Sequence, residues 1–279
     1  MRARGGRNTY GHAIGILVLD TVFPRILGDI GHAGTFPFPV LYHRVRHASP
    51  ARVVRQGDPA LLDSFLDGAR ALQAAGVLAI TTSCGFLAMF QRQLAAAVDV
   101  PVFTSALQLV PLVAAMLGPS RAVGVLTVDA RALGSKHLAG AGISEDMRVV
   151  VRGLENGRAF TRVLLENEME LEVEAARREN VEAARDLMER HPEVGAIVLE
   201  CTTCRPTPRR SAKPPASRCS TSRPSCAWCT PRSPRRYTDR ALLSPVYRTG
   251  ARPPGLPSGH PGRGTSDGKK DTLCTDDGI

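Results

Sequence analysis

Lysine is nearly missing from the first 203 residues, where Lys136 stands alone. An enzyme that uses pyridoxal phosphate needs a lysine to form a Schiff base with the cofactor. Lys136 falls in the helical-looking segment G-S-K-H-L, away from the predicted strand ends where a site would lie. A pyridoxal mechanism is therefore not expected, and the sequence predicts a protein that needs no cofactor and no metal.

Cysteine is equally scarce in this part of the chain, which contains only Cys84 and Cys201. Two cysteines cannot build the disulfide framework of a small secreted protein, so both are expected to be free thiols. No apolar run approaches the roughly 20 residues needed to cross a bilayer, and the N-terminus lacks the apolar core of a secretory signal. We therefore expect a cytoplasmic protein without a membrane partner.

Charge and proline content divide the chain at about residue 203. Residues 1–203 contain 21 Lys and Arg against 21 Asp and Glu, whereas residues 204–279 contain 15 against 5. The later segment also holds 12 of the 21 prolines and 5 of the 7 cysteines. The composition predicts a neutral globular body, residues 1–203, followed by a disordered, basic, Pro-rich tail, residues 204–279.

Two features of the tail suggest a function if they are taken literally. Cys201-Thr-Thr-Cys204 and a second C-x-x-C pair at residues 226–229 are separated by 21 residues, a spacing typical of a four-cysteine zinc site. The many arginines, with Trp228 and Tyr237 among them, are typical of a nucleic-acid-binding arm.

A one-base deletion near Thr203 explains the tail better than either function. The composition changes abruptly inside the motif E-C-T at residues 200–202, and back-translation into the neighbouring frame yields a hidden helix, a strand and an amphipathic helix. We therefore expect neither zinc nor a nucleic-acid partner. The native frame would supply closing helices, so the polypeptide as written is expected to expose apolar surface and to be unstable or inactive.

The body alternates short apolar runs with amphipathic stretches, a pattern typical of a parallel sheet covered by helices. Residues 59–75 have a helical apolar spacing that ends at Gly76, and residues 166–190 are predicted to form one long, charged helix. Strands are predicted at residues 14–20, 40–46, 77–83, 102–104, 123–128, 148–152 and 194–201.

Two pairs of strand sequences look like internal copies. G-I-L-V-L-D at residues 15–20 resembles G-V-L-T-V-D at 124–129, and V-L-A-I-T-T-S-C at 77–84 resembles V-G-A-I-V-L-E-C at 194–201. The copies lie 109 and 117 residues apart, in the same order. They predict an α/β fold of two similar, open, doubly wound parallel-sheet halves related by pseudo-two-fold symmetry, residues 1–118 and 119–203.

Both cysteines follow a predicted strand, where the ligand crevice of an open parallel sheet lies. Cys84 precedes Gly85, where a helix can begin, and the unpaired N–H groups there would lower the pKa of its thiol. Gly85 permits close backbone approach, and the hydroxyls of Thr82 and Ser83 could bind a carboxylate beside those N–H groups. A lone buried cysteine is commonly a small apolar residue, but two at matching positions favour a function.

Two opposed thiols suit the inversion of a carbon that carries a proton. One base removes the proton from one face, and an acid of similar pKa returns a proton to the other face. One cysteine in each half would provide this symmetry.

Residues 14–203 resemble the aspartate/glutamate racemase superfamily, which includes hydantoin racemases, maleate isomerases and arylmalonate decarboxylases. The resemblance rests on G-I-L-V-L-D-T at residues 15–21, T-T-S-C-G at 81–85, G-V-L-T at 124–127 and E-C-T at 200–202. It implies a cofactor-independent racemase or isomerase of a small carboxylate, such as aspartate, glutamate or a hydantoin.

The resemblance assigns roles to individual residues. Cys84 and Cys201 take the two acid/base positions, and Asp20 takes the strand-end position that faces the substrate, although a turn-forming role fits it equally well. Glu200 is not included, because neighbouring side chains on a strand point to opposite faces. Further substrate-binding groups are expected at Thr82, Ser83, Gly85, Thr127, Thr202 and Thr203.

Two alternatives stay open from the sequence. One is a lyase or isomerase that uses a single cysteine, like a decarboxylase or a maleate isomerase. The other is a binding protein for small molecules without turnover. A homodimer is the commonest assembly for such a body.

Overall fold

The computed structural model describes residues 5–7, 9–201 and 246–248. Met1–Thr249 form one compact unit, and the second unit, Gly250–Ile279, lies outside the described residues. Both predicted halves therefore belong to the first unit. The boundary between them stays a prediction.

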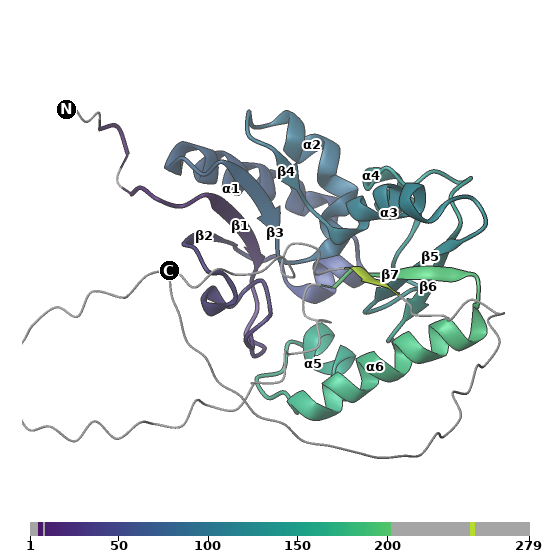
Figure 1. The fold of residues 1–279 in the computed structure, drawn as a ribbon. Helices are drawn as coiled ribbons and strands as arrows, with labels where there is room; N and C mark the ends of the chain where they lie inside the picture. The colour runs from purple at the N-terminus through teal and green to yellow at the C-terminus, as the bar shows by residue number, and fades with distance from the viewer. Residues whose placement is uncertain (1–4, 8, 202–245, 249–279) are drawn as a thin grey trace, which may run out of the picture. The chain divides into compact units, whose positions relative to one another are not determined.

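The described residues form two sheets, as Figure 1 shows. The first has the strand order β2-β1-β3-β4, with β1 at Ile14–Leu19, β2 at Val40–Val45, β3 at Ala79–Thr82 and β4 at Val102–Phe103. The second has the order β6-β5-β7-β8, with β5 at Ala122–Thr127, β6 at Val149–Gly153, β7 at Val194–Leu199 and β8 at Val246–Arg248.

Short helical turns and longer helices connect the strands. The turns are η1 at Ala33–Thr35, η2 at Ala51–Arg55, η3 at Pro59–Leu61, η4 at Gly85–Phe90 and η5 at Ala106–Leu109. The helices are α1 at Leu62–Ala75, α2 at Gln91–Ala96, α3 at Val110–Leu117, α4 at Ser135–Gly140, α5 at Thr161–Glu166 and α6 at Val173–Arg190.

The seven predicted strands are confirmed to within about two residues at each end. β1, β2, β3 and β4 pair in parallel, as do β6, β5 and β7. All six residues of β5 and all six of β7 are buried, which accounts for their nearly continuous apolar sequences. The predicted α/β class with parallel sheets is confirmed.

Helix α1 shows why its sequence is helical. Phe65, Ala69 and Leu72 recur at a spacing that places them on one buried face. The preceding turn begins at Asp58, whose carboxylate accepts the N–H of Ala60. The helix ends at Gly76, whose φ of 89° is a left-handed conformation that a glycine adopts easily.

The long helix predicted over residues 166–190 is confirmed from Val173 to Arg190, but it begins seven residues later than predicted, after a loop. Helix α5 ends at Glu166, and α6 begins at Val173. Asn167 has a φ of 57°, and its side-chain oxygen accepts the N–H of Val22 at 2.8 Å. A tertiary hydrogen bond to the segment after β1 therefore accompanies the break, which helical periodicity alone does not reveal.

Gly15 in β1 and Gly124 in β5 lie in similar surroundings. A Cβ added at Gly15 of β1 would lie 3.0 Å from Leu72 and 3.1 Å from Val77. A Cβ added at Gly124 of β5 would lie 2.9 Å from Leu187 and 3.0 Å from Val194. In each case the neighbours are a leucine of the helix that precedes the adjacent strand and a valine at or just before the start of that strand. This agrees with duplication, while the pseudo-two-fold relation stays a prediction.

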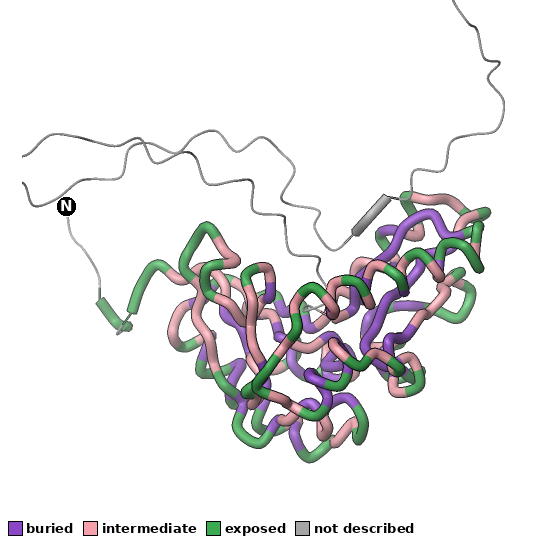
Figure 2. Tube along the Cα trace, turned by 90° about the horizontal axis from the view of Figure 1, so that it is seen from below, coloured by how far each residue is buried: buried purple, intermediate pink, exposed green. Residues whose placement is uncertain are grey.

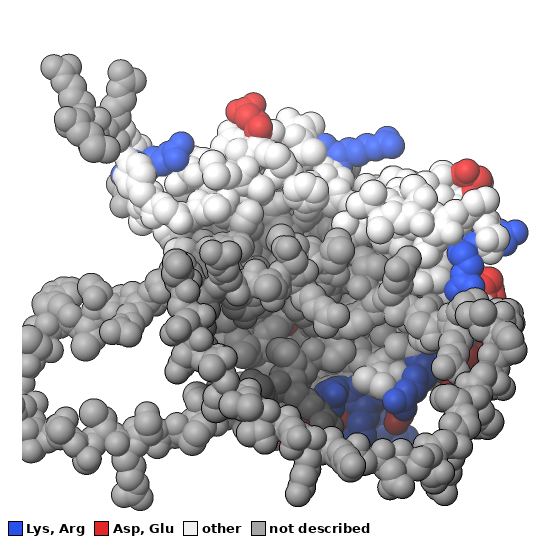
Figure 3. Space-filling model, in the orientation of Figure 1, with Lys and Arg blue, Asp and Glu red and all other residues white. Residues whose placement is uncertain are grey.

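One contiguous apolar core joins the two sheets, running from Leu17 to Leu199. Figure 2 shows buried residues along the strands and exposed residues along the outer sides of helices and loops. On the face drawn in Figure 3, acidic and basic side chains of the described residues are scattered in small groups. Among the described residues, no helix is both long and apolar enough to cross a membrane.

Strand β8 lies in the segment that was predicted to be a disordered tail. Its three residues pair antiparallel with β7, in the register Ala196↔Arg248 to Val198↔Val246. The free edge of β7 has backbone groups that need partners, and an added strand satisfies them. The rest of the tail lies outside the described residues, including the C-x-x-C pair at 226–229.

Candidate active site

The carboxyl ends of β3 and β7 bring the two cysteines to one cavity. Cys84 follows β3 by two residues and caps η4, and Cys201 follows β7 by two residues. Both line a cavity of about 30 Å³, together with Phe23, Arg25 and Glu200. Both thiols are free. Segments that are 117 residues apart in the chain therefore meet at this cavity, called here the two-cysteine cavity.

The pKa of Cys84 is raised well above its usual range, contrary to the expectation from its position before a helical turn. Burial of the thiol is the largest cause, followed by the nearby carboxyl group of Glu200 and then by Cys201. The N–H of Phe86 and the positive charge of Arg25 oppose this increase. The predicted N–H contact is present, but burial and like charge outweigh it.

Gly85 lies against Glu200 in the cavity wall. A Cβ added at Gly85 would be within 2.2 Å of Glu200 Oε1 and within 2.6 Å of its backbone oxygen. No larger residue fits there without movement of the chain. The group that approaches Gly85 is Glu200, which follows β7, and the predicted part of Gly85 in substrate binding stays a prediction.

Glu200 is a buried carboxyl group that the sequence analysis did not include in the site. Its side chain is only 1% exposed, and its Oε2 accepts a 2.8 Å hydrogen bond from the hydroxyl of Thr127. Its Oε1 has no hydrogen-bond partner among the described residues. Burial raises the pKa of Glu200 to about 7, and the bond from Thr127 opposes the increase. Near neutral pH the group can therefore both accept and release a proton.

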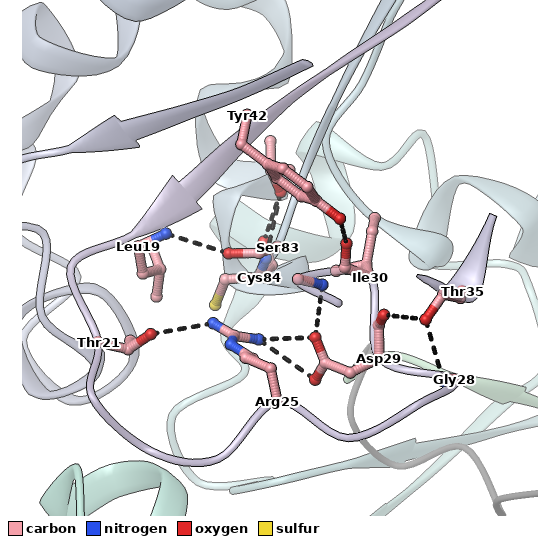
Figure 4. A network of polar contacts seen from close by, with 12 residues as sticks. Leu19, Thr21, Arg25, Gly28, Asp29, Ile30, Thr35, Tyr42, Ser83 and Cys84 are labelled. Atoms are coloured by element: carbon pink, nitrogen blue, oxygen red, sulfur yellow. Dashed lines mark hydrogen bonds and ion pairs between the residues drawn. The ribbon is translucent and has the colours of Figure 1, made fainter. Parts of the chain in front are cut away.

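Arg25 supplies a cation to the same cavity. Its guanidinium donates to Asp29 at 3.1 and 3.3 Å and to the hydroxyl of Thr21 at 3.2 Å. It also lies 4.2 Å from the ring centroid of Phe23. Figure 4 shows the guanidinium beside the side chain of Cys84. These contacts hold the cation in one place, so it is prepared to face an anion without reorganisation.

The hydroxyls before Cys84 are largely used by the protein itself. Thr82 Oγ1 bonds the backbone oxygens of Thr104 at 2.7 Å and Cys84 at 2.9 Å. Ser83 lines the cavity, and its Oγ accepts the N–H of Leu19 at 3.1 Å. Both residues therefore shape the loop that carries the thiol. Their predicted binding of a substrate carboxylate stays a prediction.

The other predicted binding residues lie in different surroundings. Thr127 is fully buried and holds Glu200. Asp20 does not line the cavity; its carboxylate accepts the N–H of His47 at 3.2 Å and lies 3.7 Å from Arg44. This placement agrees with the turn-forming interpretation. Thr202 and Thr203 lie outside the described residues.

The ionisable side chains of the described residues also bear on metal binding. No group of three or more His, Cys, Asp or Glu side chains among them could hold a metal ion. The acid/base groups of the cavity are two thiols and one carboxyl, with one guanidinium beside them. This set can move protons and attract an anion.

Comparison with known proteins returns several enzymes. No family model matches the chain. It is 27% identical to a dimethylsulfoniopropionate lyase of Durusdinium sp. clade D, over 70% of this chain and 66% of that protein. It is 30% identical to dimethylsulfoniopropionate lyase 5 of Emiliania huxleyi, over 70% of this chain and 40% of that one. The chain thus spans between about two fifths and just under two thirds of these relatives.

Solved structures also match the chain, at a lower sequence identity. An arylmalonate decarboxylase variant matches with a TM-score of 0.44 and 19% identity, covering 67% of this chain and 76% of that one. An aspartate racemase homologue from Pyrococcus horikoshii matches with a TM-score of 0.43 and 15% identity, covering 69% and 86%.

Sequence reasoning missed the two charged residues that line the cavity, Arg25 and Glu200, as well as its apolar lining. Arg25 follows β1 by six residues, so a search for charged groups after strand ends could have found it. Glu200 was set aside because it alternates with Cys201 along a strand. That argument fails because the strand ends at Leu199, and residues beyond a strand need not alternate.

Proposed function

We propose that this chain is an enzyme that removes and returns the proton on the carbon next to a carboxylate, as a racemase-type isomerase does, with Cys84 and Cys201 as its acid and base. The observation that carries the proposal is the meeting of two free thiols, one from each sheet, in one cavity. One thiolate would take the proton, and the opposite thiol would supply one to the other face.

The substrate class follows from the charge of the cavity wall. A carboxylate entering the two-cysteine cavity would meet the guanidinium of Arg25, which uses only part of its five N–H donors on Asp29 and Thr21. The same cation would stabilise the negative charge that develops next to the carboxylate after the proton leaves. Small carboxylates such as aspartate, glutamate or a hydantoin-derived acid are the first candidates.

A second candidate is a lyase acting on a sulfonium carboxylate. The relatives named as dimethylsulfoniopropionate lyases favour it. A thiolate that removes the proton next to the carboxylate leaves an electron pair that forms a carbon–carbon double bond, while dimethyl sulfide departs with the electrons of the broken carbon–sulfur bond. Only one thiol is needed, and the first step is the same proton removal.

The test follows the substrate's proton by NMR in deuterium oxide. Full-length protein is incubated with both enantiomers of acidic amino acids, with hydantoins and with dimethylsulfoniopropionate. An isomerase would exchange the proton and interconvert the enantiomers, whereas a lyase would release dimethyl sulfide and acrylate. The double variant Cys84→Ser, Cys201→Ser is the control for non-enzymatic exchange.

The reading frame bears on the same test. Because we interpret residues 204–279 as frameshift-derived, protein from a resequenced and restored gene is assayed in parallel. Absence of both exchange and elimination in the restored protein, across all these compounds, would contradict the proposed function.

A further inference from the structure

Glu200 is the one ionisable side chain lining the two-cysteine cavity to which the proposed reaction gives no step. It is 1% exposed, one carboxyl oxygen is held by Thr127, and the other has no partner among the described residues. An isolated buried carboxylate is costly, because nothing replaces the water it has lost. Thr127 therefore orients the group, and Oε1 is left available for a proton.

The free oxygen faces the segment that carries Cys84. Oε1 lies so close to Gly85 that no Cβ could stand between them, and Gly85 is the residue next to Cys84. Glu200 also lines the cavity together with Cys84. The carboxyl group thus comes from the second sheet, while the thiol it approaches comes from the first.

We propose that Glu200 accepts the thiol proton of Cys84, so that a carboxyl group from the β7 end activates the thiol at the β3 end. The S–H bond of Cys84 breaks and an O–H bond forms at Glu200 Oε1. The products are a thiolate and a neutral carboxylic acid, and the net charge of the pair is unchanged. This inference rests on the proposed function for its consequence in turnover, but the proton transfer itself needs no substrate.

The cavity's charges explain why the transfer matters. The ionisable groups that line the cavity with Glu200 are Cys84, Cys201 and Arg25. A thiolate beside an ionised Glu200 would place two negative charges together in a buried site, which is unfavourable. Moving the proton from the thiol to the carboxyl leaves only one negative charge. The pair then titrates as a unit, and its first proton leaves near the pKa of Glu200, about 7.

The first experiment measures formation of the Cys84 thiolate by its ultraviolet absorbance as the pH is raised. It uses the full chain with Cys201→Ser, so that only one thiol of the cavity contributes. The absorbance of the tail cysteines is removed by subtracting the titration of the double variant Cys84→Ser, Cys201→Ser. Addition of Glu200→Gln should move the Cys84 titration to lower pH by about 1 unit or more, because the like charge is gone. Glu193→Gln, an exposed carboxyl at the other end of β7, should leave it unchanged.

The second experiment measures turnover against pH with both cysteines intact. In the wild type, the rise of the turnover rate with pH (the acidic limb of the profile) should follow loss of the first proton from the pair Cys84 and Glu200. In Glu200→Gln it should move to higher pH, because the thiol must now lose its proton to water. Glu200→Gln should therefore move the Cys84 titration to lower pH and the acidic limb of turnover to higher pH. A purely structural role of Glu200 would not produce these opposite shifts. Thr127→Val is the second variant, and it should also move the limb upward, because it removes a hydrogen bond that lowers the pKa of Glu200.

Each outcome decides the inference. A Cys84 titration that does not move in Glu200→Gln overturns it, whatever the turnover. A titration that moves while the acidic limb stays in place also overturns it, since the two groups would then interact without exchanging the proton. If no candidate substrate turns over, the proposed function fails, and the titration still decides whether the carboxyl and the thiol are coupled.

Discussion

The two halves share a framework but differ beside their cysteines. Ser83 N donates to Leu17 O in the first half, and Glu200 N donates to Leu126 O in the second, each at 2.9 Å. Ser83 and Glu200 thus occupy equivalent positions, one residue before a cysteine. The serine hydroxyl accepts a backbone N–H, whereas the glutamate places a carboxyl group in the cavity. Similar backbones can therefore present two thiols in unequal surroundings.

The largest expected effect comes from replacing the thiols one at a time. Cys84→Ser and Cys201→Ser should each reduce racemisation by about 10²- to 10⁴-fold, because a serine hydroxyl is a much weaker base at neutral pH. Each variant should still exchange the proton of one enantiomer with deuterium, and the two should prefer opposite enantiomers. NMR in deuterium oxide measures both. Full racemisation by either variant would refute the paired-thiol assignment, and dependence on one cysteine alone would favour the lyase.

The next effect concerns the free energy of unfolding and its dependence on the carboxyl group of Glu200. Burial raises the pKa of Glu200 in the folded protein to about 7, above the 4.5 that is usual for a glutamate carboxyl group. Its contribution to stability is therefore present below 4.5 and is lost as the pH rises through 7. Relative to the wild type, Glu200→Gln should gain about 3 kcal/mol in unfolding free energy between these limits. Urea unfolding at several pH values measures it, with Glu193→Gln as the control. If the difference in unfolding free energy between Glu200→Gln and the wild type does not vary with pH, Glu200 does not have a raised pKa in the folded protein.

A third comparison tests whether the halves pack alike. Gly15→Ala and Gly124→Ala should each cost about 1–3 kcal/mol, because the added methyl group meets packed side chains at 3.0 and 2.9 Å. Gly134→Ala is the control, since a Cβ there meets nothing within 4 Å. Thermal or urea unfolding measures all three. A large cost at only one of the first two positions would argue against equivalent packing.

The smallest effect concerns the link between Asn167 and the segment after β1. Asn167→Gly keeps the left-handed conformation but loses the oxygen that accepts the N–H groups of Val22 and Phe23. We expect a loss of about 1 kcal/mol in unfolding free energy. Asn167→Asp retains an acceptor oxygen and should lose less. Equal losses in the two variants would show that the hydrogen bonds contribute little.

Strand positions could be predicted from the sequence because burial on both faces leaves a nearly continuous apolar run. β5 and β7 are the clearest cases. The position of each cysteine just past the carboxyl end of a strand also followed, since the ligand crevice of an open parallel sheet lies there. Their meeting in one cavity depends on how the two sheets pack, because Cys84 follows a strand of one sheet and Cys201 a strand of the other. The break at Asn167 did not follow, because the partner of its side chain is more than 140 residues away.

The amino-acid sequence by itself determined the strands, the α1 helix with its glycine stop and the position of each cysteine just past a strand, because these depend on local periodicity and on repeated motifs. Only the tertiary structure decided which groups surround the thiols. Burial of the thiol raises the pKa of Cys84 most, and Glu200 and Arg25, which reach it from separate segments, act on it through their charges. The direction in which the pKa of Cys84 is shifted could not be read from its flanking residues. Desolvation and Coulomb interactions depend on distance in space rather than along the chain.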